Sequence, residues 1–493
     1  MLTQLWRNPP LAGRWSAAVA MALLGLGPFV LFSTASFPLT PVLRPELGAA
    51  PASLQLANGL ANAAYALSVV VAADLVQRLP AHRLYLACTA GFAVGSAIAA
   101  LAPGAGWFAA GRVLQGAATG MLLVVALPPL VTRHGAARVP LTVALVNLGL
   151  FGGAAAGTTV GSLLTGPGQW RLLLGALAVV GLGGFAMGVL GFERAAPPDP
   201  RMGFDFSGIP LAAAATILPF VGVSLLAGGG GSVAVPVVVV AAGLAALVAL
   251  VVREYRKEHP LMPVRLIAHT LPVTGIGSAM LAGAGFTAVL ELSVIRLRDV
   301  DGLGTATVGG VLVTQVVGMV VALWLITRVL PTRWLPVLVL GGLLTISAAG
   351  VLLATAGTLL PAVPVAAVTG LLLGLGAGAG VGPGLFLGAL SVPAPRLGPA
   401  FALVQLLRAE AAFLFAPLVM RLATAAPDTA AGVRQVALVV ASTTAVGALL
   451  LTGVLLLGGS RPQAPDLQRW VDGDGPAYRS PAMVALLRKS RES

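Results

Sequence analysis

Four charged side chains lie inside long apolar stretches of this sequence. Glu291 and Glu410 are acids, and Arg112 and Arg408 are cations, each with apolar residues on both sides. A charge at the middle of a membrane helix costs about 2.5–3.5 kcal/mol on insertion scales, so these residues are candidates for function. Glu410 stands about 18 Å along its stretch at 1.5 Å per residue, which is close to mid-membrane. Because desolvation favours the neutral form of a carboxyl group, Glu410 suits reversible protonation.

Three of these charges also have structural explanations. Backbone carbonyls of neighbouring helices would satisfy the guanidinium of Arg112, and an arginine partner would explain Glu410 by packing alone. Arg408 stands two residues from Glu410, so the two side chains face different sides of one helix and do not pair readily. Holding helices together therefore explains Arg408 at least as well as substrate contact.

Glu291 stands about twenty residues into its own apolar stretch, which places it near a membrane surface. It is a second candidate for a proton or cation site. Ion pairing with Arg296 or Arg298, which follow it closely, is the structural alternative.

Two segments 258 residues apart read as copies of one another. Residues 138–148 and 396–406 both begin with arginine and both reach Ala-Leu-Val followed by a carboxamide, which is Asn147 in the first and Gln405 in the second. These carboxamides occupy matching depths, where we expect polar packing between helices or contact with substrate. Internal duplication in a mostly apolar chain is typical of transporters built from two repeats, with the substrate site at the repeat interface.

The composition is that of a membrane protein. Hydrophobic residues make up 58% of the chain and charged residues 9%, with a mean hydropathy of +0.97. Runs of about 20 apolar residues are long enough to cross the hydrocarbon core as helices. We predict an all-α membrane protein with fourteen such helices, at residues 15–36, 55–76, 84–102, 106–129, 139–163, 172–191, 208–227, 232–252, 272–294, 305–327, 335–356, 362–388, 398–420 and 435–458.

The net charge of +13 reports membrane topology rather than nucleic-acid binding. With the N-terminus inside, 21 of the 29 Lys and Arg residues fall at inside helix ends, six at outside ends and two within helices. This bias predicts that both termini are cytoplasmic. The chain is expected in the cell membrane with lipid, and not nucleic acid, around it.

The repeats also predict how the chain divides. A second pair of similar segments, 77–83 and 327–333, shares two arginines five residues apart with a proline between them. Both pairs are shifted by eight helices, although two six-helix halves would give a shift of six, so two helices were inserted in the middle. The predicted plan is six plus two plus six: a bundle at 1–191, two inserted helices with linkers at 192–269, a bundle at 270–459 and a cytoplasmic tail at 460–493.

Metal and nucleotide chemistry find no support in the sequence. Cys88 is the single cysteine, which provides neither a disulfide nor a thiolate metal site. No phosphate loop, dinucleotide motif or metal-ligand spacing is present, so we expect no cofactor, no metal and no enzyme activity. All four histidines lie at predicted cytoplasmic helix ends: His82, His134, His259 and His269.

Several short motifs resemble those of the major facilitator superfamily, in particular its fourteen-helix drug:proton antiporter branch. The most specific is Gly111-Arg112-Val-Leu-Gln115-Gly116, which resembles the family's Arg-x-x-Gln-Gly motif. The others, in order, are the small-residue antiporter motif at 157–162, Trp170-Arg171, Asp205-Phe-Ser-Gly208 and the segment 259–266. The resemblance covers all fourteen predicted helices and implies a role for Arg112 and Gln115 in proton switching or binding of an anionic substrate group.

The chain departs from this pattern at three places. In the cytoplasmic loop motif, at residues 73–82, Arg78 is present, but Gln77 stands where the family has an acid, and Asp74 lies three positions earlier. Arg83 follows directly and is expected in the same gating loop. We expect Asp74 to serve in the gating loop or as a helix cap, pairing with Arg78 or a neighbouring loop. The first helix has Phe-Ser-Thr at 32–34, near where drug antiporters carry an aspartate, and a threonine at 158 replaces the antiporter proline.

The resemblance implies a secondary transporter working by alternating access, in which protons drive efflux of lipophilic or amphipathic small molecules such as drugs. A monomer is expected. Metabolite uptake or uncoupled exchange remains an alternative because of the missing acid in the first helix. A non-transporting membrane sensor or scaffold is the alternative from another class.

Overall fold

The computed structural model describes residues 9–197, 199, 205, 207–227, 233–257, 260 and 262–483. Within them, fourteen helices are long and apolar enough to cross a membrane, which confirms the predicted number and the all-α class. The first helix, α2 (Trp15–Glu46), continues ten residues past its predicted end at residue 36, through Pro38, Pro41 and Pro45. Proline is tolerated in membrane helices because neighbouring helices and Ser or Thr side chains satisfy the backbone groups that it leaves without partners.

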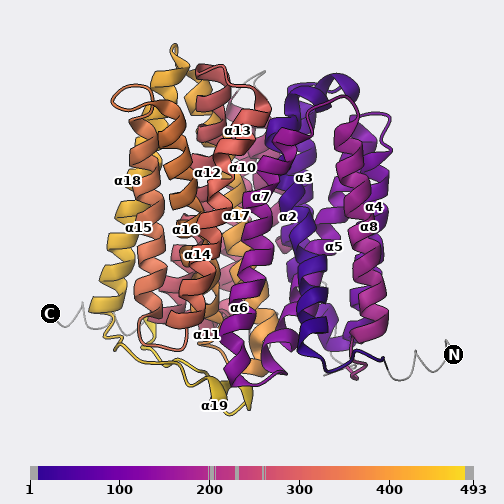
Figure 1. Ribbon diagram of the computed structural model, residues 1–493. Helices are drawn as coiled ribbons and strands as arrows, with labels where there is room; N and C mark the ends of the chain where they lie inside the picture. Colours follow the sequence, from indigo (N-terminus) through magenta and orange to yellow (C-terminus); the bar gives the residue numbers. More distant parts are fainter. Residues whose placement is uncertain are drawn as a thin grey trace. The chain divides into compact units, whose positions relative to one another are not determined.

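The contacts divide the chain into two compact units (Figure 1). Unit 1 comprises Met1–His134 and Val160–Met262, and unit 2 comprises Gly135–Thr159 and Pro263–Ser493. The repeat-based division into 1–191, 192–269 and 270–459 stays a prediction; the contacts group the two extra helices with unit 1 and residues 135–159 with unit 2.

Unit 1 holds seven of the membrane helices among its described residues, and the division between the units falls inside α7 (Gly153–Leu163). The seven are α2, α3 (Pro51–Arg78), α4 (Ala81–Ala100), α5 (Ala105–Thr132), α8 (Gln169–Gly191), α9 (Gly208–Ala227) and α10 (Ala234–Arg256).

Unit 2 begins with the 3₁₀ turn η1 (Ala136–Arg138), helix α6 (Val139–Asn147) and the π-helical segment η2 (Leu148–Gly152). It continues with α11 (Val264–Ile267), α12 (Thr270–Ile295), η3 (Arg296–Val300), α13 (Thr305–Leu312), α14 (Thr314–Val329), α15 (Leu335–Ala354), α16 (Ala362–Ala389), η4 (Ala394–Arg396), α17 (Leu397–Ala425), α18 (Thr429–Leu457) and α19 (Leu467–Val471).

Glycines on α5 set the close packing of unit 1. A Cβ built on Gly116 would lie 2.0 Å from the carbonyl oxygen of Ala61, and one built on Gly120 would lie 2.2 Å from that of Tyr65. Only glycine allows the backbones of α3 and α5 to approach this closely. Because Gly116 belongs to the Arg-x-x-Gln-Gly motif, the same motif supplies both the buried arginine and the contact that positions its helix.

In unit 2 the glycine-rich helix α16 packs against α12, α14 and α15. A Cβ on Gly374 would lie 1.8 Å from the carbonyl oxygen of Gln315 in α14, and one on Gly384 would lie 2.6 Å from that of Gly275 in α12. These glycines allow α16 to approach its neighbouring helices closely.

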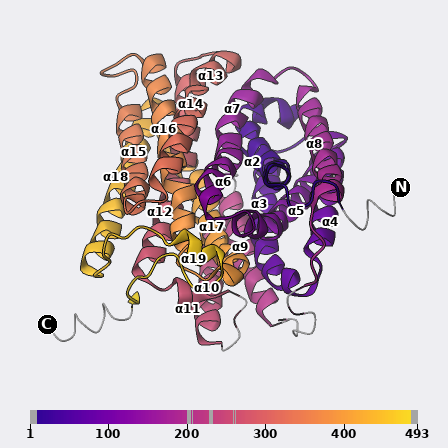
Figure 2. The ribbon, with the colours of Figure 1, turned by 60° about the horizontal axis from the view of Figure 1, so that its bottom comes forward.

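The segment after α18 packs against unit 2 (Figure 2). Trp470 in α19 is fully buried, and its indole nitrogen donates a hydrogen bond of 2.8 Å to the carbonyl of Val392, between α16 and α17. The backbone amide of Ala477 donates to the carbonyl of Leu390 at 2.8 Å, and that of Thr270 donates to the carbonyl of Pro481 at 3.0 Å. The tail is thus folded on unit 2 as far as residue 483. The basic end of the tail, after residue 483, lies outside the described residues.

Candidate functional site

Arg112 is the centre of a buried polar cluster in unit 1. Only 1% of the residue is exposed, and its guanidinium carbon lies 4.9 Å from the ring centre of Phe29 and 4.7 Å from that of Phe32 in α2. The guanidinium donates to the side-chain oxygen of Gln115 at 2.5 Å and to the hydroxyl of Ser33 at 3.2 Å. A spacing of three residues places Arg112 and Gln115 on one side of α5, so the motif itself creates this contact.

Gln115 connects the cluster to α4. Its side-chain nitrogen donates to the hydroxyl of Ser96 at 2.6 Å, and Ser96 donates in turn to the carbonyl of Phe92 at 2.8 Å. Arg112 is therefore held in one orientation by side chains from α2, α4 and α5. Ser96 and Phe29 were not singled out from the sequence, and Phe32 and Ser33 were noted only for the aspartate that is missing there, because only the folded helices bring these residues to the arginine.

The acidic residues on the membrane helices of unit 1 are each bonded to groups other than Arg112. Glu46 accepts hydrogen bonds of 2.8 Å from the indole of Trp170 and from the backbone amide of Gly168. Asp74 pairs with Arg78 at 2.9 Å, and Glu254 accepts from Arg253 at 2.6 Å. Among the described residues, no carboxylate lies within 4 Å of the Arg112 guanidinium, whose Nε also lacks a hydrogen-bond partner. Arg112 is thus a buried cation without a counter-ion among the described residues of its unit.

Unit 2 contains the two buried acids that the sequence predicted. Glu410 in α17 is 3% exposed, and both of its oxygens are buried without a hydrogen-bond partner among the described residues. Arg408 does not pair with it but donates to the side-chain oxygen of Gln405 at 2.7 Å and lies 5.7 Å from the ring centre of Phe151. Arg408 therefore contacts Gln405 and Phe151 within its unit, and among the described residues it supplies no counter-ion to Glu410.

Glu291 in α12 is 7% exposed. The pairing with Arg296 or Arg298 that we considered is absent, because Arg296 pairs with Asp301 at 2.9 Å and Arg298 with Asp299 at 2.6 Å. A Cβ on Gly283 of α12 would lie 3.5 Å from Ala412 of α17. Because Ala412 is two residues from Glu410, Gly283 lies at about the same depth as Glu410. Glu291 follows Gly283 by eight residues, or about 12 Å of helix rise, so the two acids lie at different depths.

The duplicated carboxamides make different contacts. Asn147 donates to the carbonyl of Gly378 in α16 at 3.1 Å, and its oxygen is buried without a partner. Gln405 instead accepts from Arg408 within its own helix. A third carboxamide, Gln315 in α14, is fully buried, and neither of its polar side-chain atoms has a hydrogen-bond partner among the described residues. In the sequence, Gln315 is a lone glutamine in an apolar stretch, which is a weaker indication of function than a charged residue in such a stretch.

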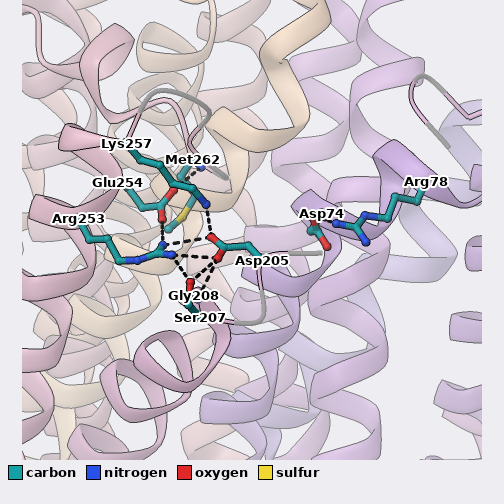
Figure 3. Close-up of polar contacts among 9 residues, drawn as sticks. All are labelled: Asp74, Arg78, Asp205, Ser207, Gly208, Arg253, Glu254, Lys257 and Met262. Atoms are coloured by element: carbon teal, nitrogen blue, oxygen red, sulfur yellow. Dashed lines mark hydrogen bonds and ion pairs between the residues drawn. The ribbon is translucent and has the colours of Figure 1, made fainter. Parts of the chain in front are cut away.

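The residues expected in the gating loop lie beside an ion-pair network at one end of unit 1 (Figure 3). Asp74 and Arg78 form an ion pair one turn apart on α3, while Arg83 is exposed. Asp205, from the linker before α9, pairs with Arg253 at 2.9 Å and with Lys257 at 2.6 Å. These contacts attach the linker to the end of α10. Of the motif segments, Phe206, His259 and Leu261 lie outside the described residues.

The pKa of Asp205 follows from this network. Burial raises the pKa, but hydrogen bonds from Arg253, Lys257 and Ser207 favour the charged form and hold the pKa below the usual aspartate range. Asp205 is therefore an anion at neutral pH that organises two cationic side chains. This role is structural, and the sequence motif did not reveal it.

In the described part of the chain, no group of three or more His, Cys, Asp or Glu side chains is arranged to hold a metal ion. Arg112 in unit 1 and Glu410 in unit 2 are ionisable side chains that the described helices bury without a partner of opposite charge.

Comparisons with known proteins bear on the family to which the chain belongs. The sequence profile of the Major Facilitator Superfamily matches residues 21–417. An uncharacterized MFS-type transporter of Bacillus subtilis, YubD, is 28% identical over 56% of this chain and 54% of its own length. The cephamycin export protein of Amycolatopsis lactamdurans is 32% identical over 64% of this chain and 67% of its own. The tetracenomycin C resistance and export protein of Streptomyces glaucescens is 26% identical over 68% of this chain and 62% of its own length.

Solved structures show the same fold at low sequence identity. The human organic anion transporter MFSD10 matches with a TM-score of 0.63 at 15% identity, covering 89% of this chain and 99% of its own. The proton:xylose symporter XylE matches with a TM-score of 0.60 at 14% identity, covering 89% of this chain and 95% of its own. This likeness shows the fold, and the profile match over residues 21–417 shows that the protein belongs to the Major Facilitator Superfamily of membrane transporters and is a multi-pass integral protein of the cell membrane.

Proposed function

We propose that this protein exports lipophilic or amphipathic small molecules by alternating access, driven by protons moving inward. The single observation that carries the proton coupling is Glu410, a deeply buried acid whose two oxygens have no partner among the described residues. An ionised carboxylate in such surroundings is costly and in practice neutralises. A group of this kind can take up a proton on one side and release it when the conformation changes.

The relatives support the direction of transport. Two of the curated relatives are named as export proteins, one for cephamycin and one for tetracenomycin C. Charged residues make up only 9% of the chain. A binding site with apolar walls and few charges favours cargo with a large apolar part.

We further propose that both termini face the cytoplasm, that two six-helix bundles flank the two extra helices α9 and α10, and that the protein works as a monomer. The excess of Lys and Arg at alternate helix ends supports the orientation. Glu291, nearer a membrane surface than Glu410, is proposed as a secondary proton site.

Transport into proteoliposomes with an imposed pH gradient tests the coupling. We expect Glu410→Gln to abolish gradient-driven transport of an amphipathic dye while leaving dye binding intact, and Glu291→Gln to have a smaller effect. Glu46→Gln is the matched control: Glu46 is an acid in a membrane helix, but it is hydrogen-bonded to Trp170, and the amide oxygen retains that acceptor. If proton-coupled flux is unchanged in both Glu410→Gln and Glu291→Gln, the coupling proposal fails.

A further inference from the structure

A pocket lies at the end of unit 1 where α2 begins and where α5 and α8 end. It encloses about 410 Å³ of empty space, part of it open to solvent. Its lining includes Arg14, directly before α2, Arg133, directly after α5, and Phe192, directly after α8. Three helices that are long and apolar enough to cross a membrane therefore begin or end at this pocket. The ends of membrane helices lie in the headgroup region of the bilayer, so phospholipid headgroups surround this level of the protein.

The lining of the pocket continues from this level along two helices. On α2 it extends from Arg14 to Met21, and on α5 from Arg133 back to Ala126. Each distance is seven residues, or about 10 Å of helix rise. The lining residues within these two helices are all apolar: Ala18, Met21, Ala126, Pro129 and Leu130. The pocket therefore has a charged mouth at the helix ends and an apolar interior.

The mouth, formed by Arg14, Arg133, His134 and Glu193, carries a net positive charge. Two arginines and one glutamate leave one positive charge when the histidine is neutral. Glu193 forms an ion pair with Arg133. Arg14 is exposed, and its guanidinium has no ion pair among the described residues. The mouth thus presents to a ligand one cation that no described residue neutralises.

We propose that this pocket binds an anionic phospholipid, with the phosphodiester at Arg14 and one acyl chain along the apolar interior. Basic pockets between membrane helices on the cytoplasmic side suit anionic lipid headgroups, and in the proposed orientation α2 begins on that side. An inorganic phosphate would use the mouth but would leave the apolar interior unfilled. A bound lipid would connect the start of α2 with the ends of α5 and α8 and stabilise unit 1. The inference goes beyond the proposed transport function and does not depend on it.

Lipid binding to the full-length protein tests the inference. Protein in a nonionic detergent is titrated with dioleoyl phosphatidylglycerol or with dioleoyl phosphatidylcholine, which has the same chains but no net charge, and native mass spectrometry measures the bound fraction. Phosphatidylglycerol is expected to bind about tenfold more tightly, as hydrogen bonds to charged groups imply. Arg14→Gln should remove this preference. Arg44→Gln is the matched control, because Arg44 is an exposed arginine in the last turn of the same helix, outside the pocket, and should leave the preference unchanged.

A second variant changes the affinity in the opposite direction. Glu193→Gln removes the acid of the mouth and releases Arg133 from its ion pair. Phosphatidylglycerol should therefore bind this variant more tightly than the unmodified protein, by up to about tenfold. A misfolded variant would lose affinity, so a gain in Glu193→Gln together with a loss in Arg14→Gln separates the effect of charge from misfolding.

Three results would overturn the inference. The first is equal affinity of the unmodified protein for the two lipids. The second is a preference for phosphatidylglycerol that neither Arg14→Gln nor Glu193→Gln changes. The third is displacement of the lipid by millimolar glycerol 3-phosphate, a headgroup without acyl chains, which would indicate a site for soluble phosphates. The proposed function fails separately: an absence of dye flux under a pH gradient, in liposomes with or without phosphatidylglycerol, would refute export and leave lipid binding intact.

Discussion

The side-chain amide of Asn147 lies against the glycine-rich helix α16. Its nitrogen donates a hydrogen bond of 3.1 Å to the carbonyl of Gly378, and its oxygen lies over Gly382. A Cβ built on Gly382 would be 1.9 Å from that oxygen. The first copy of the duplicated segment is thus attached to α16 through one carboxamide. This contact depends on the absence of a side chain at Gly382, one turn after Gly378 on α16.

We therefore expect Gly382→Ala to destabilise the protein, because the added methyl overlaps Asn147 and forces a shift that costs about 1–3 kcal/mol. Thermal unfolding of the purified protein in detergent measures the effect. Gly341→Ala is the control, since a Cβ there meets nothing within 4 Å in the interior of α15; it should be neutral or raise stability by up to about 1 kcal/mol. Equal melting temperatures for the two variants would show that the Asn147 contact is not tight.

A second prediction concerns the tail. Trp470→Ala removes a fully buried indole and its hydrogen bond to Val392, a loss of about 3–5 kcal/mol for a core tryptophan. The tail should then detach from unit 2 and become a better trypsin substrate at Arg469 and Arg479. Mass spectrometry of a digestion time course detects the cuts. Trp334→Ala, at an exposed tryptophan, should leave the digestion pattern unchanged, and resistance of Trp470→Ala to trypsin would refute a docked tail.

The third prediction is a pH dependence at Asp205. Its pKa is lower in the folded protein than the ordinary value of about 3.9, so its ionisation stabilises the fold fully above that value. The contribution is lost as pH falls through the folded pKa. Asp205→Asn should therefore be less stable than the unmodified protein by a constant amount from about pH 5 to 8, and by a shrinking amount below about pH 4.

Melting temperatures of Asp205→Asn and of the unmodified protein, measured from below about pH 4 to about pH 8, test the prediction. Ser207→Ala removes one donor to Asp205 and should show the same trend with a smaller amplitude. A stability difference between Asp205→Asn and the unmodified protein that does not change with pH would refute a lowered pKa at this site.

The fourth prediction concerns topology. If both termini are cytoplasmic and fourteen helices span the membrane, a reporter fused after residue 230 lies outside and one fused after residue 493 lies inside. A paired alkaline phosphatase and fluorescent protein reporter distinguishes the two sides in cells. Both fusions on the same side would contradict the proposed orientation.

The sequence alone determined the number of membrane helices and the residues worth testing in them. Each helix must satisfy its own backbone hydrogen bonds in lipid, so about 20 apolar residues predict a helix without reference to its neighbours. The contact between Arg112 and Gln115 was equally local, because three residues of one helix separate them. A buried charge is visible in the sequence for the same reason, as with Glu410 and Glu291.

Only the tertiary structure decided which partner each polar group has. Asn147 and Gln405 occupy matching positions in the repeats, yet one bonds to the backbone of α16 and the other to Arg408. Arg296 lies near Glu291 in sequence but pairs with Asp301. Contacts of this kind depend on how closely helices distant in sequence approach and in which rotation. Glycine contacts such as Gly116 against Ala61 set that approach, and no periodicity in the sequence encodes it.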